Sequence, residues 1–306
     1  MSYNWQYKKW PSFIYSEATV TRQALELARL MGVMDGVMST LNNKNKQETV
    51  VRLMTEEALN TSAIEGEIFN RNDVMSSLKN RLGINKRPEV VKDRNAQAVA
   101  ELMIEVRQNW KKKLGAGLIK DWHCTLLKNA NHINVGKWRS GTTSMQVVSG
   151  SIGKETVHFE APPANLVPAN IREFIQWYND YKVSGDIQHA IIKTAIAHLY
   201  FETIHPFEDG NGRIGRALAE KCLAECLGKP VMMSLSFAIE KKRKEYYKAL
   251  KEAQSSLHIN NWLVYFANTL IAAQQDAIEM VKFSVKKSTL LNKYKADLTE
   301  RQLQEL

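Results

Sequence analysis

The sequence predicts an all-α, mainly helical protein with one small β-hairpin flap. Apolar residues recur at spacings of three and four along most of the chain, as in Leu27, Leu30 and Met34, which is the period of an amphipathic helix. No proline occurs between Pro11 and Pro88, so nothing in that stretch obliges a helix to break. Short β-rich pieces gather in a single segment that glycines punctuate.

The helical periodicity falls into four stretches. Residues 16–82 are expected to form helical hairpins, and Pro88 marks a joint because proline disfavours helix in the residue before it. Further helical stretches cover 90–110, 119–130 and 169–285. The chain is therefore helical on both sides of the β-rich segment.

The β-rich segment ends at Pro162 and Pro163. Two pieces typical of strands, 146–148 and 156–159, lie on either side of a turn at 150–153. We expect a hairpin that projects from the helical body as a flap.

Three regions follow from this pattern. They are an N-terminal helical region (1–88), a core (89–275) and a C-terminal helix or linker (276–306). Thr299, with Gln302 three residues on, has the pattern of a helix start, so the chain stops inside a new helix. We interpret this end as a cut before a further domain; a frayed tail is the alternative.

The charge balance favours anionic partners. Lys and Arg total 42 against 32 acidic residues, which gives a net charge of +10. The basic runs 111–113 and 241–244 sit beside apolar residues at helical spacing, so we interpret them as solvated helix faces. The charge alone identifies no partner.

Cysteine usage and hydropathy point to a soluble, cytoplasmic protein. The three cysteines have neither a disulfide-like count nor metal-ligand spacing, which fits a reducing compartment. No run approaches the ~18 apolar residues of a membrane span, and the N-terminus lacks a signal-peptide pattern. No membrane contact is expected.

One twelve-residue segment, 205–216, holds the densest group of functional residue types. It follows an apolar run and leads into helix-forming sequence, so it should be a loop that opens a helix. Gly210 and Gly212 let backbone N–H groups converge, and a helix N-terminus adds positive potential. Arg213 and Arg216 are three apart and share a helical face. The loop is suited to hold a polyphosphate.

His205 and Asp209 complete this segment. A histidine titrates near neutrality and can accept a proton as a general base. A single carboxylate suits Mg²⁺, which keeps several waters and takes one or two protein carboxylates. A glycine-rich turn beside a packed histidine is the alternative, but it does not account for base, metal ligand, anion loop and two arginines in twelve residues.

This segment resembles the motif of the Fic family. It matches HPFx(D/E)GN(G/K)R and a further arginine three residues on, without a mismatch. The resemblance extends over residues 92–269, where 136–139 resembles the stretch before the family's flap and 147–163 the flap itself. It implies the mainly helical Fic fold and the transfer of AMP from Mg-ATP to a Ser, Thr or Tyr hydroxyl of a protein, self-modification included.

The resemblance also implies roles for the motif residues. His205 would be the catalytic base and Asp209 the Mg²⁺ ligand. The phosphate-binding groups, from the α- to the γ-phosphate, would be Asn211 with the amides near Gly210 and Gly212, then Arg213, then Arg216.

Two further sites are expected on the same basis. The family docks its target as an added strand on the flap, which makes Val147, Val148 and His158 candidate contacts; an ordinary hairpin is the alternative. Tyr246 or Tyr247 would line the adenine pocket, or one or both would belong to the core.

Residues 61–66 resemble the family's inhibitory motif, (S/T)xxxE(G/N). Helical geometry adds to the resemblance, because a single stripe contains Val50, Met54, Ala58, Thr61 and Glu65. A glutamate buried near a helix C-terminus needs a cationic partner. The resemblance implies that Arg216 is that partner and that Glu65 is inhibitory.

The stretch 5–11 resembles the start of an uncharacterised region that precedes many bacterial Fic cores. A winged-helix DNA-binding module often follows such cores, so DNA is a candidate partner through a module after Leu306. The sequence leaves open removal of AMP, transfer of UMP or phosphocholine, and a nucleotide-sensing DNA-binding regulator. It also leaves open the target, the modified residue type and whether the chain forms a homodimer.

Overall fold

The computed structural model describes residues 2–142, 145–149, 156–183 and 185–294, with side chains except at 147–149, 156–158 and 287–294. This part of the chain holds eleven α-helices and one two-stranded hairpin, which confirms the prediction of a mainly helical protein with a small flap. The helices are α1 (Thr21–Ser39), α2 (Asn43–Ile64), α3 (Arg71–Arg81), α4 (Arg94–Gln108), α5 (Ala116–Leu126), α6 (Val167–Asp180), α7 (Ile187–Ile204), α8 (Asn211–Leu227), α9 (Leu235–Lys241), α10 (Arg243–Ala253) and α11 (Asn260–Tyr294). Short 3-10 helices cover Asn4–Gln6, Glu17–Val20 and Ala164–Leu166.

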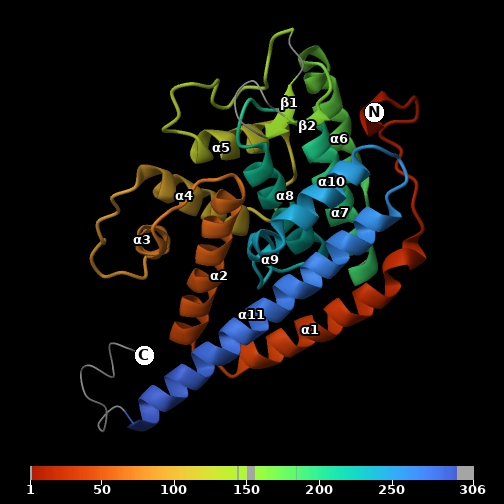
Figure 1. Ribbon diagram of the computed structural model, residues 1–306. Coiled ribbons are helices and arrows are strands. Elements are labelled where there is room, and N and C mark those ends of the chain that lie inside the picture. Colours follow the sequence, from red (N-terminus) through yellow and green to blue (C-terminus); the bar gives the residue numbers. More distant parts are fainter. Residues whose placement is uncertain (1, 143–144, 150–155, 184, 295–306) are drawn as a thin grey trace.

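The helical hairpin α7–α8 lies in the middle of the molecule, with α5 on one side and α10 on the other (Figure 1). Every side chain of α7 from Ala190 to Ile204 is buried, as expected for a helix that is apolar all round. Both helices contribute to two hydrophobic clusters, one with α1, α9 and α11 and the other with α2 to α6. The hairpin therefore fixes the position of the loop that joins α7 to α8.

Helix α2 carries the predicted inhibitory motif. Asn42 caps its N-terminus by accepting a hydrogen bond from the N–H of Asn45, and the helix ends where Gly66 takes a φ of 87°. Of the predicted stripe, Met54, Ala58 and Thr61 are buried and Val50 is half-buried, whereas Glu65 is the C-cap residue and is exposed. The C-terminal end of α2 meets the first turns of α8.

The two long helices α1 and α11 run side by side along one edge of the molecule (Figure 1). Helix α11 continues across residue 275 without a break. The domain boundaries at 88 and 275 stay predictions. The helix expected from Thr299 lies outside the described residues.

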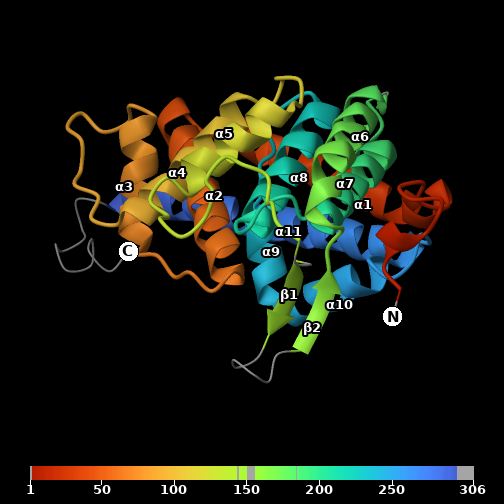
Figure 2. The same ribbon diagram turned by 90° about the horizontal axis from the view of Figure 1, so that it is seen from above.

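The flap consists of β1 (Gln146–Ser149) and β2 (Thr156–Glu160), antiparallel strands that project from the helical body (Figure 2). Val147 pairs with Phe159 and Val148 with Val157, with an irregularity between them. The predicted contacts Val147, Val148 and His158 have side chains outside the described residues.

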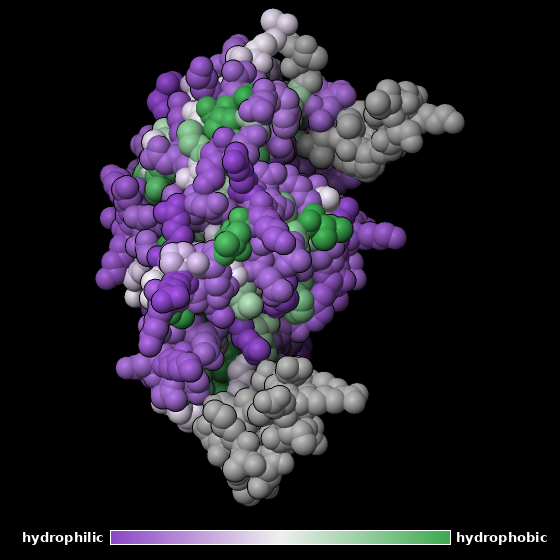
Figure 3. Space-filling model, turned by 90° about the vertical axis from the view of Figure 1, so that its left-hand side faces the viewer, coloured by the Kyte–Doolittle hydropathy of each residue, from purple (hydrophilic) through white to green (hydrophobic). Residues whose placement is uncertain are grey.

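None of the helices in the described part of the chain is both long and apolar enough to cross a bilayer. The face seen in Figure 3 is mostly hydrophilic, with apolar residues scattered singly or in small groups.

Candidate active site

The α7–α8 loop (residues 205–210) begins at a strained residue. His205 ends α7 in the left-handed region, with φ 49° and ψ 61°, and is the only non-glycine residue with positive φ in the described chain. A side chain in this conformation costs ~1–2 kcal/mol, and helices usually end there with glycine or asparagine. Strain of this kind gathers at functional positions.

Backbone contacts hold the α7–α8 loop in one shape. The Asn211 amide donates to the Phe207 carbonyl and accepts from the Phe207 N–H, both at 2.9 Å. The Phe207 ring stacks on His123 with centroids 3.9 Å apart. Because both polar groups of the Asn211 side chain bond within the loop, this side chain shapes the loop, and its contact with a phosphate stays a prediction.

The N-terminus of α8 is free of a capping side chain. Its N-cap is Gly210, at φ 78°, which has no side chain to accept from the first N–H groups of the helix. The carboxylate of Glu65 is packed here instead: a Cβ on Gly212 would lie 2.1 Å from its Oε1. The Glu65 carboxylate therefore lies at the N-terminus of α8 and beside Arg216, where the positive potential of both favours an anion.

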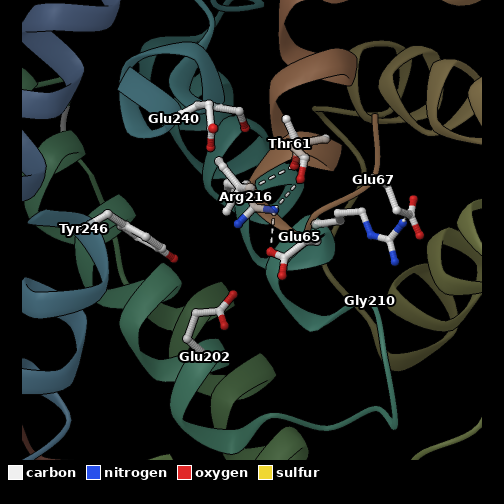
Figure 4. Close-up of polar contacts among 12 residues, drawn as sticks. Thr61, Glu65, Glu67, Glu202, Gly210, Arg216, Glu240 and Tyr246 are labelled. Atoms are coloured by element: carbon white, nitrogen blue, oxygen red, sulfur yellow. Dashed lines mark hydrogen bonds and ion pairs between the residues drawn. The ribbon is translucent and has the colours of Figure 1, made fainter. Parts of the chain in front are cut away.

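Arg216 is held by the C-terminal end of α2. Its guanidinium donates to the hydroxyl and the carbonyl oxygen of Thr61 and to Oε1 of Glu65, each at 2.8 Å (Figure 4). The side chain is only 1% exposed. Burial disfavours its charge, but Glu65, together with Tyr246 and Glu202, more than offsets this and raises the pKa of Arg216.

Arg213 is paired in the same way with a second carboxylate. Its Nη1 donates to Oε2 of Glu67 at 2.6 Å, and Oδ2 of Asp209 lies 3.6 Å from its Nη2. Glu67 follows Glu65 by two residues in the α2–α3 connector (residues 65–70). Both phosphate-binding candidates on α8 therefore face carboxylates from this connector.

The imidazole of His205 is largely buried, with Arg139 and the carboxylates of Glu65 and Asp209 nearby. Burial, with a further contribution from Arg139, lowers its pKa to about 4, so the ring is neutral at pH 7. Its Nδ1 lies 4.0 Å from Oε2 of Glu202. Glu202 is itself buried, which raises its pKa to about 8.

A cavity of about 400 Å³ opens beside the loop, lined in part by Asp209, Arg213 and Glu67. Asp209 is half exposed there, and its Oδ1 accepts a hydrogen bond from the Gly210 N–H at 2.6 Å. No group of three or more His, Cys, Asp or Glu side chains that could hold a metal occurs among the described residues. A divalent ion at Asp209 would have to complete its coordination with waters and substrate oxygens, as Mg²⁺ does.

Residues 113–223 match the Fic/DOC family, and residues 3–84 match a domain of unknown function, DUF4172. The segment 113–223 therefore carries a Fic domain. The second match agrees with the uncharacterised N-terminal region expected ahead of the Fic core.

Relatives of the Fic domain carry adenylyltransferase names. A probable protein adenylyltransferase of Aquifex aeolicus is 36% identical over 96 residues, or 31% of this chain and 27% of the relative. Protein adenylyltransferase fic-1 of Caenorhabditis briggsae is 30% identical over 143 residues, or 47% of this chain and 23% of the relative. The chain thus spans about a quarter of the length of these relatives.

Solved structures share the fold. A Fic family protein from Desulfovibrio desulfuricans superposes with a TM-score of 0.67 at 20% identity, covering 88% of this chain and 77% of that one. A Fic-domain signalling protein from Bacteroides thetaiotaomicron gives 0.62 at 20% identity, covering 84% and 97%. At this identity the likeness shows the fold alone.

Arg139 joins the α7–α8 loop to the base of the flap. The sequence alone did not assign this residue to the site. Its guanidinium donates to the carbonyl of His205 at 2.7 Å and to that of Pro162 at 2.5 Å. Its own N–H donates to Pro206 at 2.9 Å. Its place at the end of the 136–139 stretch was the only signal. Arg139 fixes the flap relative to His205.

The two candidate tyrosines on α10 differ in burial. Tyr246 is buried and its hydroxyl bonds Nε2 of His198 at 2.9 Å, which places it in the core. Tyr247 is exposed, and its hydroxyl donates to the Ile64 carbonyl at the end of α2. A contact of either ring with adenine stays a prediction, and the position of Tyr247 fits it better.

Proposed function

We propose that this protein transfers AMP from Mg-ATP to a protein hydroxyl and that Glu65 restrains the reaction. The observation that carries the proposal is the placement of His205 beside an uncapped helix N-terminus with two buried arginines. Together they provide a base next to a site for a polyphosphate. The adenylyltransferase names of the relatives support the same reaction.

His205 would act on the attacking hydroxyl. Its Nδ1 is buried and faces Glu202, which leaves Nε2 to face a substrate. As the hydroxyl oxygen bonds to the α-phosphorus of ATP, its proton passes to Nε2. The bond from the α-phosphorus to the bridging oxygen breaks, and pyrophosphate leaves.

The remaining motif residues would bind the nucleotide. The α8 N-terminus would hold the α-phosphate, Arg213 the β-phosphate and Arg216 the γ-phosphate. Asp209 would hold Mg²⁺, which would offset the charge that develops on pyrophosphate. The low protein ligand count at Asp209 fits that ion.

The flap would align the target. Each of its two strands has one neighbour in the described sheet, so each has an outer edge on which an extended segment could add. Arg139 couples the base of the flap to the carbonyl of His205. A docked strand would therefore be placed relative to the base.

Radiolabelled nucleotides test the proposal. The Glu65→Gly variant is incubated with Mg²⁺ and ATP labelled at the α- or the γ-phosphate, with labelled UTP and CDP-choline in parallel. We expect protein-bound label from α-labelled ATP only, and none in the Glu65→Gly/His205→Ala variant. Label from the γ-phosphate would indicate a kinase, and preferential label from UTP or CDP-choline a different transferred group; either contradicts the proposal.

A further inference from the structure

Glu67 contacts a residue that the inhibitory motif does not address. Its Oε2 accepts from Arg213 at 2.6 Å, whereas Glu65 bonds Arg216. Arg213 is 3% exposed and Glu67 37%. The cation is thus buried and the carboxylate reaches it from the rim of the 400 Å³ cavity, which both residues line.

This pair differs from an ordinary surface ion pair. Exposed pairs contribute little, because water competes for both partners. A buried guanidinium, by contrast, needs a carboxylate near it, and the Nε of Arg213 has no partner in the described structure. Asp209 is at 3.6 Å, so Glu67 supplies the close contact.

The backbone couples Glu67 to Glu65. The N–H of Gly66 donates to Ala63 at 2.9 Å and that of Glu67 to Ser62 at 3.0 Å, the bond pattern of a Schellman motif. Gly66 supplies the left-handed residue that the motif needs, at φ 87°. The backbone positions of Glu65 and Glu67 are therefore fixed relative to each other, and each side chain reaches one arginine.

We propose that Glu67 is a second inhibitory residue, which keeps Arg213 from the β-phosphate while Glu65 keeps Arg216 from the γ-phosphate. The inference rests on the proposed function, because it takes the two arginines to be phosphate ligands. It follows that loss of Glu65 alone releases the site in part. Full release needs both carboxylates to leave.

Nucleotide binding separates the two contacts. Mg-ADP carries the α- and β-phosphates but no γ-phosphate, so its affinity depends on Arg213 and not on the arginine that Glu65 holds. Calorimetric Kd values for Mg-ADP and Mg-ATP are measured for the parent, Glu65→Gly, Glu67→Gln, the double variant and the control Glu48→Gln. Glu48 is an exposed carboxylate on α2, so the control removes the same charge away from the site.

We expect Glu67→Gln to lower the Kd for Mg-ADP by about three- to tenfold, both in the parent and in Glu65→Gly. This is the value of a charge-assisted contact, reduced because Glu67 is partly exposed. Glu67→Ala should do the same, and circular dichroism checks that each variant folds. Mg-ADP affinity equal to that of Glu48→Gln would overturn the inference.

AMP incorporation by the same variants tests the proposed function separately. If Glu65→Gly incorporates no AMP while Glu67→Gln tightens Mg-ADP, the transfer reaction is wrong but the role of Glu67 stands. If Glu65→Gly incorporates AMP and Glu67→Gln changes neither the Kd for Mg-ADP nor the rate, the transfer reaction stands but the role of Glu67 is wrong.

Discussion

The α7–α8 loop and the α2–α3 connector meet at the same two arginines but are held in opposite ways. The loop is fixed by bonds that its own backbone makes, through Asn211 and Arg139. The connector reaches the site through the side chains of Glu65 and Glu67, which are 30% and 37% exposed. The proposed phosphate site is thus preorganised, whereas the carboxylates that fill it belong to a separate segment.

The exposure of the connector supports this difference. Ile68, next to Glu67, is 89% exposed. Segments with little buried apolar surface open at low free-energy cost, while a packed loop opens only with its core. Displacement of the connector would leave the loop and its strained His205 intact.

The largest expected effect comes from a substitution in the α7–α8 loop. In the Glu65→Gly background, His205→Ala should lower the rate of AMP incorporation by about 100- to 10,000-fold, the usual contribution of a general base. Its Kd for Mg-ATP should stay within about threefold, because the base acts on the hydroxyl. The surface variant His189→Ala serves as control; a comparable rate in His205→Ala would remove its assigned role.

Arg216 tests the comparison between the loop and the connector, because it is both the partner of Glu65 and a proposed phosphate ligand. Arg216→Ala breaks the contact with Glu65 but also removes the proposed γ-phosphate ligand. We expect it to lower AMP incorporation in the Glu65→Gly background by about 10- to 100-fold, the value of a charge-assisted hydrogen bond. A rise in rate like that of Glu65→Gly would mean that this arginine only anchors the connector.

The smallest expected effect concerns Glu202, a buried residue near the C-terminal end of α7. Burial raises the pKa of Glu202 from 4.5 to about 8, so its contribution to stability is full below pH 4.5 and is lost as pH rises through about 8. Glu202→Gln should therefore reduce the fall in unfolding free energy between these values, measured by urea denaturation. A residual fall is expected from Glu220, whose pKa burial also raises to about 8. An unchanged pH dependence would mean that Glu202 is hydrated.

The sequence predicts those parts of the site that are local in the chain. The glycine and arginine positions of 205–216 follow from one loop and one helix turn, and the periodicity of α2 leads to the helix end at which Glu65 lies. The pairing of Glu67 with Arg213 joins residues 146 positions apart, past the end of a helix, where no period applies. Only the tertiary fold brings them together.

Other residues were ambiguous for physical reasons that the fold makes plain. Tyr246 shares a buried stripe with Leu250 and Ala253, so helical phase could have assigned it to the core and Tyr247 to the surface. Glu202 offered no such signal, because α7 is buried on all sides and has no polar face to set its phase.

The central claim, that a preorganised transferase site is filled by its own glutamate, is tested most directly by intact-mass spectrometry. The parent, Glu65→Gly and Glu65→Gly/His205→Ala proteins are incubated with saturating Mg-ATP, and the fraction that gains the mass of one AMP group is followed with time. We expect Glu65→Gly to gain it about tenfold or more faster than the parent, because a contact worth ~1.5–3 kcal/mol returns to the γ-phosphate, and the double variant not to gain it. Equal rates in the parent and Glu65→Gly would contradict the account.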